Sequence, residues 1–379
     1  MAARGWILPA LFLSFAILPL LTSAFLRFPG RHIGRNHDFG HFHHPHDAHN
    51  IEDPNHYTGD EEAASEHAEP HGGVEEPETP KEPLREGFYA QSCPQAEKVA
   101  TEIMKKHFSR DPTLAPAIVR LFFHDCFVTG CDASILLDVT PTGEDVEKKS
   151  PHNGEFVRGF EVIDEIKAQL EFECPGVVSC ADILAFANRD SLVQAALPYY
   201  NVAAGRRDGL ASLARNVEHN VPLPGDSAQE IIQLFEKKGL SIEEMVVLSG
   251  AHSIGTAHCT IIADRFHDPE KAKEIDRGYL ITMQTLTWCV NNTQTIAFDP
   301  YSHHKMDSRF YKELLKKRAL IESDNNLAKE PHAQEYMRKF AVDQQGWIEK
   351  FTTAIIKMGE IEVLTGNQGE IRKQCRGVN

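Results

Sequence analysis

The sequence has no excess of basic residues: 39 lysines and arginines stand against 55 aspartates and glutamates, giving a formal net charge of −16. Nucleic acids are bound by basic surfaces that match their phosphates, so this balance argues against a nucleic-acid-binding protein. The chain also lacks internal repeats, and it lacks alternating apolar and polar runs long enough for a sheet. These absences argue against solenoids and predominantly β folds.

Outside its first 24 residues, the chain has no apolar run long enough to span a bilayer. In that segment Arg4 supplies a short positive start, an apolar run covers residues 6–21, and Thr22 and Ala24 give a small-x-small cleavage pattern. The alternative is a membrane anchor, but the run is short for one and ends in small residues. We predict a signal peptide over residues 1–24 and a secreted product.

Residues 25–85 lack apolar periodicity and hold ten of the 20 histidines, together with 13 acidic and 5 basic residues. Such a segment cannot bury enough surface to offset its ordering entropy, so we predict that it is disordered. Histidine-rich tracts bind transition metals through neutral imidazoles. Two interpretations stay open: an extension that binds metal, and a solvated tail or propeptide.

Residues 86–379 show the opposite pattern, with apolar residues at helical spacing through most of the segment. Ser241 and Glu244 form a capping-box pattern before an apolar run. Proline and glycine mark joints, as in residues 222–225. The pattern predicts an all-α domain with substantial loops.

Eight cysteines follow the predicted signal peptide, and an even number in a secreted chain predicts four disulfides. The alternative is a zinc site, which the oxidising compartment and the lack of a second closely spaced cysteine pair disfavour. Their pairing stays open at this point.

Candidate catalytic residues are densest in residues 120–134 (RLFFHDCFVTGCDAS). Arg120 and His124 lie four positions apart, so they share one face of a helix and can wall a small pocket together with Phe123. A second histidine, His252, lies in residues 249–255 (SGAHSIG), where Gly250 is expected to let the backbone approach a flat ligand. A lone histidine is more often a core residue, but two in such surroundings suit haem, which needs one axial ligand and an open opposite side.

These motifs resemble those of the plant secretory (class III) haem peroxidases, over nearly all of residues 86–379. The resemblance implies a two-lobed, all-α fold with haem between the lobes, and an enzyme that reduces hydrogen peroxide and oxidises phenolic donors in one-electron steps. The matching motifs, in order, are residues 87–94 (GFYAQSCP), 120–134, 158–164 (RGFEVID), 174–184 (CPGVVSCADIL), 205–209 (GRRDG), 249–255, 357–366 (KMGEIEVLTG) and 369–379 (GEIRKQCRGVN).

The resemblance assigns roles on the peroxide side of the haem. His124 would take a proton from peroxide and return it to the outer oxygen, acting as general base and then general acid. Arg120 would stabilise the charge that develops as the O–O bond breaks. Asn153 would accept a hydrogen bond from the other nitrogen of His124, and Glu147 would link Asn153 to a calcium site.

On the other side of the haem, the resemblance makes His252 the axial ligand and Asp324 its carboxylate partner. Pro222 matches the proline of the donor site, and a rigid turn is an equally good interpretation of it. The implied cofactors are one haem b and two Ca²⁺ ions.

The two implied calcium sites draw on alternating oxygen ligands in loops, which suit this cation, although loop capping stays an alternative for Asp299. The distal set is Asp125, Val128, Gly130, Asp132 and Ser134. The proximal set is Ser253, Asp299, Ser302, Lys305 through its carbonyl, and Asp307. The implied disulfides are Cys93–Cys174, Cys126–Cys131, Cys180–Cys375 and Cys259–Cys289.

The expected protein is a monomer of the cell wall or apoplast, because no tail for vacuolar sorting follows Asn379. It carries one glycosylation sequon, at Asn291. The rival interpretation is a secreted metal-binding protein on a catalytically weak peroxidase scaffold, and the joint presence of Arg120, His124, Asn153 and His252 disfavours it. A zinc hydrolase ranks lower because no HExxH pattern occurs.

Overall fold

The computed structural model describes residues 82–153, 156–288 and 293–379. The predicted signal peptide and almost all of the predicted extension therefore lie outside the described residues, as do Cys289 and Asn291. Residues 82–379 belong to one structural unit, and everything below concerns that unit.

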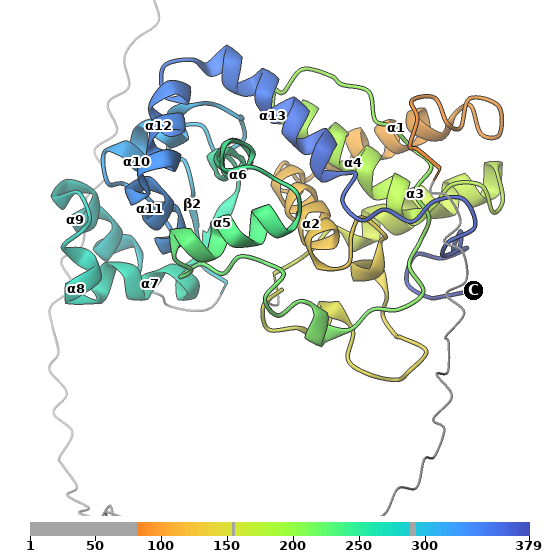
Figure 1. Ribbon diagram of the computed structural model, residues 1–379, viewed down its shortest axis with the longest axis horizontal. Coiled ribbons are helices and arrows are strands. Elements are labelled where there is room, and N and C mark those ends of the chain that lie inside the picture. Colours follow the sequence, from red (N-terminus) through yellow and green to blue (C-terminus); the bar gives the residue numbers. More distant parts are fainter. Residues whose placement is uncertain (1–81, 154–155, 289–292) are drawn as a thin grey trace, which may run out of the picture. The chain divides into compact units, whose positions relative to one another are not determined.

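The described chain is mostly helical, as predicted (Figure 1). Its α-helices are α1 (Ala96–Phe108), α2 (Leu114–Val128), α3 (Phe160–Glu173), α4 (Cys180–Gln194), α5 (Ala228–Lys237), α6 (Ile242–Ser249), α7 (Cys259–His267), α8 (Pro269–Ala272), α9 (Arg277–Leu286), α10 (Arg309–Leu315), α11 (Glu322–Lys329), α12 (Pro331–Phe340) and α13 (Gln344–Met358). Four 3₁₀ turns accompany them: η1 (Ser134–Leu136), η2 (Glu147–Lys149), η3 (Ala214–Asn216) and η4 (Gly250–Ser253). Within these residues, none of the helices combines the length and apolar character needed to cross a membrane.

A short antiparallel pair of strands interrupts the helical pattern. Strand β1 (Thr256–His258) pairs with β2 (Thr295–Ala297), with Thr256 opposite Ala297. The sequence did not predict this pair, because three residues are too few for alternation to be recognised. The pair lies directly after His252 and joins the segment that carries it to the segment of the proposed proximal calcium ligands.

The helices form two groups, seen on opposite sides in Figure 1. In one group α2 packs along α4, and both helices also contact α1. In the other, α6 packs against α12 and α13, while α10, α11 and α12 pack together. Thus α2, which carries His124, and η4, which carries His252, are each backed by a separate set of buried helices.

Local sequence signals explain how α6 and η4 are held. Ser241 and Glu244 form the predicted capping box at the start of α6. At its end, the Trp347 indole N–H donates to the Val247 carbonyl at 3.1 Å. A Cβ on Gly250 would lie 2.5 Å from Trp347, so the close approach that Gly250 permits is to this core side chain. The prediction for Gly250 therefore named the wrong partner: the group that packs closely on this glycine is the Trp347 side chain and not a flat ligand.

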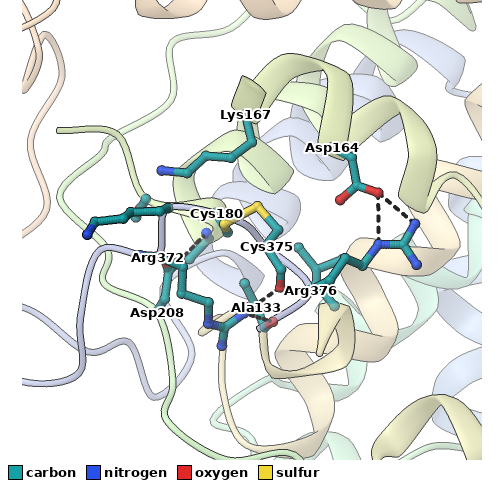
Figure 2. The surroundings of a disulfide bond; sticks show 12 residues. Ala133, Asp164, Lys167, Cys180, Asp208, Arg372, Cys375 and Arg376 are labelled. Carbon is teal, nitrogen blue, oxygen red and sulfur yellow. Dashed lines mark hydrogen bonds and ion pairs between the residues drawn. A yellow bond between two sulfur atoms is a disulfide. The ribbon is translucent and has the colours of Figure 1, made fainter. Parts of the chain in front are cut away.

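Three of the four predicted disulfides are confirmed within the described residues: Cys93–Cys174, Cys126–Cys131 and Cys180–Cys375. Cys259 is also disulfide-bonded, and its expected partner Cys289 lies outside the described residues. The Cys180–Cys375 bond ties the C-terminal segment to the first residue of α4 (Figure 2). Because it closes a loop of 195 residues, it restricts the unfolded chain strongly.

Candidate active site

His124 lies on α2 and is oriented by Asn153. Its Nδ1 lies 2.7 Å from the Asn153 side-chain oxygen, while the Asn153 amide nitrogen donates to the Glu147 carbonyl at 2.7 Å. That second bond turns the amide oxygen of Asn153 toward the imidazole, so Nδ1 of His124 is the donor. The tautomer that follows leaves the other ring nitrogen, Nε2, without a proton and able to act as a base.

The surroundings of His124 keep its imidazole neutral. Burial, together with the positive charge of Arg120, lowers the pKa of His124 to about 3. Arg120 itself donates to the Asn153 carbonyl at 3.1 Å, so Asn153 holds both side chains. Phe123 lies between them in sequence, with its ring edge-on to His124 at 5.7 Å and packed on Phe127 at 4.2 Å. These contacts place a base, a cation and an aromatic ring side by side.

His252 belongs to η4, and Asp324 of α11 lies behind it. The His252 Nδ1 is 3.1 Å from each carboxylate oxygen of Asp324. Burial alone would lower the pKa of His252, but the negative charge of Asp324 outweighs it and raises that pKa. A carboxylate in this place fixes the tautomer and makes the free Nε2 a stronger ligand.

Phe298, which immediately precedes Asp299, is a site residue that the sequence did not reveal. Its ring stacks on His252, with 4.5 Å between ring centroids and 5° between planes. Phe298 and His252 are 46 positions apart and are brought together by the pairing of β1 with β2, so no local sequence pattern predicts their contact.

The charge of Arg120 acts on both histidines. The charge of Arg120, one turn from His124 on α2, reaches His252 and opposes the rise of its pKa. Each imidazole has its Nδ1 held by an oxygen, and within the part of the chain that the structure describes its Nε2 has no such partner. One histidine backed by a carboxylate and one backed by a neutral amide fit a haem that takes one axial ligand and leaves its other side open.

The proposed distal calcium ligands lie together around the C-terminal end of α2. Asp125 accepts hydrogen bonds from the backbone of Ala133 at 3.0 Å, and Asp132 from that of Ser134 at 2.9 Å. Both carboxylates are buried. The carboxylate of Glu147 is fully buried nearby, and neither of its oxygens has a hydrogen-bond partner among the described residues.

Burial and mutual repulsion perturb these carboxyl groups. Burial, with the charge of Asp132, raises the pKa of Glu147 to about 8, and burial raises that of Asp132 to about 6. A bound cation would compensate such a group of buried carboxylates, above all that of Glu147, which has no hydrogen-bond partner among the described residues. Among the described residues, no group of three or more histidine, cysteine, aspartate or glutamate side chains is arranged to hold a metal. The proposed distal set has two carboxylates, those of Asp125 and Asp132. Its other proposed ligands are backbone carbonyls and a serine hydroxyl, which are not among these four side-chain types.

The proposed proximal set also comes together in space. The Ser302 hydroxyl oxygen lies 3.0 Å from the Asp299 carboxylate and 2.7 Å from the Asp307 carboxylate, and Asp307 N–H donates to the Ser253 hydroxyl at 3.4 Å. Lys305 N–H bonds to the Ser302 carbonyl at 3.0 Å and closes the loop. Ser253 follows His252 directly in the chain, so the proposed proximal set includes the residue next to the proposed haem ligand.

Pro222 lies half-buried in a turn before α5. The Leu223 N–H donates to the Asp226 carboxylate at 2.7 Å, and the Pro224 carbonyl accepts from Ser323 N–H at 2.8 Å. The turn is thus anchored beside Asp324, and among the described residues no hydrogen bond joins Pro222 to either histidine.

Comparison with known proteins agrees with this geometry. The peroxidase family model matches residues 100–343. Peroxidase 39 of Arabidopsis thaliana is 40% identical over 304 residues, covering 78% of this chain and 93% of that protein. Peroxidase 5 of Vitis vinifera is 41% identical over 302 residues, covering 78% and 92%. Peroxidase 1 of Zea mays is 41% identical over 315 residues, covering 80% and 85%. The chain therefore belongs to the plant secretory (class III) haem peroxidases, enzymes that act on hydrogen peroxide.

Proposed function

We propose that His124, Arg120 and Asn153 carry out the proton transfers of peroxide reduction, that His252 holds the haem iron, and that phenols are the electron donors. The observation that carries this proposal is the pair of oriented imidazoles. One is kept neutral by burial and held by Asn153, and the other is made more basic by Asp324. Haem, when bound, would supply the electrons that break the O–O bond.

The residues on the peroxide side act on protons and charge. Nε2 of His124 takes the proton of the inner peroxide oxygen and delivers it to the outer oxygen, which leaves as water. The guanidinium of Arg120 stabilises the negative charge that builds on the departing oxygen. Asn153 keeps Nδ1 of His124 protonated, so that Nε2 is the atom that acts. Phe123 limits the space beside them.

The donor assignment is tested by the stoichiometry of turnover. Because one peroxide takes up two electrons and a phenol gives one, two phenols should be consumed per peroxide reduced to water. We expect this ratio when a simple phenol is added to haem-loaded protein with limiting hydrogen peroxide. Peroxide consumption that proceeds at the same rate without the phenol, or a ratio of one to one, would contradict the donor assignment.

We also propose a Ca²⁺ ion at each of the two loops, bound by the distal set and the proximal set defined above. Two buried carboxylates support the distal ion, since burial raises the pKa of Asp132 to about 6 and that of Glu147 to about 8, and a cation would offset the cost of ionising them. Asp125 and Asp132 would bind the distal ion directly. The Glu147 carboxylate would not be a ligand, and its charge would act on the ion from beyond the ligands.

Calcium should stabilise the protein more at pH 8 than at pH 5. The folded-state pKa of Glu147, about 8, lies above its ordinary value, so in chelator-treated protein its contribution to stability is present at low pH and lost as the pH rises toward 8. Each such group costs about 1.4 kcal/mol per pH unit across that window. The measurement is the rise in melting temperature on adding Ca²⁺ at the two pH values. A Glu147→Gln control should reduce the difference, and an equal rise at both pH values would contradict the distal site.

We propose that residues 1–24 direct secretion and are removed. The extension preceding the catalytic domain should be dispensable for chemistry. The backbone of Arg85 pairs with that of Ala204, so the ordered domain begins slightly before residue 86. Deleting residues 25–81 should leave the haem spectrum and peroxide turnover unchanged, as measured side by side with the longer chain. A lost Soret band in the truncated protein would show that the extension is structural.

A further inference from the structure

The C-terminal segment of the chain lies against the loop of the proposed distal calcium ligands. Cys131 N–H donates to the Ile361 carbonyl at 3.0 Å, and Asp138 N–H donates to the Arg376 carbonyl at 3.0 Å. Arg372 lies between these contacts in the segment and is completely buried. Because this segment supplies none of the proposed ligands, it can act on the ion only through the loop.

The Arg372 guanidinium binds three carbonyls from three segments of the chain. It donates to Ala133 at 2.8 Å and to Cys375 at 3.1 Å (Figure 2), and also to Gly209 at 2.6 Å. Ala133 stands between the proposed ligands Asp132 and Ser134 and has a left-handed backbone, with φ 59°. Alanine adopts this conformation reluctantly, so a buried charged donor on its carbonyl helps to hold the loop in shape.

A second route from Arg372 to the loop passes through Gly209. The Gly209 N–H donates to the Asp132 carbonyl at 2.8 Å. A Cβ on Gly209 would lie 2.3 Å from the Asp132 carboxylate, so this carboxylate packs directly on the glycine. Arg372 thus holds Gly209, which positions Asp132, and Ala133, which follows Asp132 in the chain.

Arg372 is itself rigidly mounted. Its backbone N–H donates to the buried Asp208 carboxylate at 2.9 Å, and the other oxygen of Asp208 accepts from Ala181 N–H at 2.9 Å. Three residues later, Cys375 is bonded to Cys180 (Figure 2). Among the described residues the guanidinium donates to carbonyls and makes no hydrogen bond to the Asp132 carboxylate.

We propose that Arg372 is a positioning residue for the distal calcium site, preorganising Asp132 and Ser134 from the C-terminal segment. The inference rests on the distal calcium site proposed above. A lysine cannot replace Arg372 here, because a single ammonium on a flexible stem does not reach three carbonyls in a planar fork.

The test is the rate of Ca²⁺ release from the haem-loaded, full-length protein into a fluorescent chelator. Arg372→Lys keeps the charge and removes the fork. Arg376→Lys is the matched control, because Arg376 lies in the same segment but directs its side chain to Asp164 at 2.7 Å and is partly exposed (Figure 2). Asp132→Asn identifies which phase of release belongs to the distal site.

Arg372→Lys should accelerate the distal phase by ~10-fold or more, as losing a support of metal ligands does, and leave the proximal phase unchanged. Gly209→Ala displaces the Asp132 carboxylate while Arg372 stays intact, so it should accelerate the distal phase as well. It provides the test if Arg372→Lys does not fold. Distal release at the wild-type rate in both variants overturns the inference alone, as does equal acceleration of both phases. A wild-type protein without a distal phase overturns the calcium site as well.

Discussion

Replacing His124 by alanine should slow the reaction with hydrogen peroxide by ~10²-fold or more, the usual loss when a general acid–base group is removed. The imidazole is neutral because burial and Arg120 lower its pKa to about 3, so at any working pH it is ready to accept a proton. Its two hydrogen-bonded or charged neighbours in the described structure do not replace it, because Asn153 is a neutral amide and Arg120 is a guanidinium that stays protonated.

The measurement is the second-order rate constant for peroxide, obtained by mixing the haem-loaded variant with excess peroxide. Haem binding itself should persist, because the ligand His252 belongs to a different helical group. His152→Ala is the matched control, since His152 lies beside Asn153 in sequence and its side chain makes no hydrogen bond in the described structure. Peroxide kinetics that His124→Ala leaves unchanged would remove His124 from the mechanism.

Replacing Asp324 by asparagine should lower haem retention or peroxide turnover by ~10- to 100-fold, the typical effect of losing the carboxylate behind a ligating histidine. Asparagine has nearly the shape of aspartate but no charge. The pKa of His252 would therefore no longer be raised by a carboxylate beside its Nδ1. The ligand nitrogen would become less basic, and the imidazole could rotate.

Two measurements separate these effects: the rate of haem transfer to an acceptor protein and the rate constant for peroxide. Asp264→Asn is the control, because Asp264 is an exposed aspartate that pairs with Lys271 at 2.7 Å. If Asp324→Asn matched the control in both measurements, Asp324 would have no part in holding His252.

The sequence predicted those features of the fold that arise from local patterns. Apolar spacing indicated the helices, and the Ser241–Glu244 pair predicted the start of α6. The two histidines were recognisable because each lies within a short, dense motif. The pairing of the cysteines could be stated only through family resemblance, since residues such as Cys180 and Cys375 lie 195 positions apart.

The remaining features depend on contacts between distant segments. The prediction for Gly250 named the wrong partner, because nothing near Gly250 in sequence shows that Trp347 packs on it. Phe298 and Arg372 were missed for the same reason: each contacts its target across many positions and belongs to no periodic pattern. The link from Glu147 to Asn153 was expected, and the structure shows that it runs through the Glu147 backbone carbonyl.

The most direct measurement is the visible spectrum of residues 82–379, refolded with haem and Ca²⁺, before and after one equivalent of hydrogen peroxide and then a phenol. A high-spin ferric Soret band that shifts and bleaches with peroxide and recovers with the phenol is the predicted result. It would show that one axial ligand holds the iron and that the opposite side is open to peroxide, as the roles proposed for His252 and His124 require. Haem that binds but does not respond to peroxide would contradict the proposed mechanism.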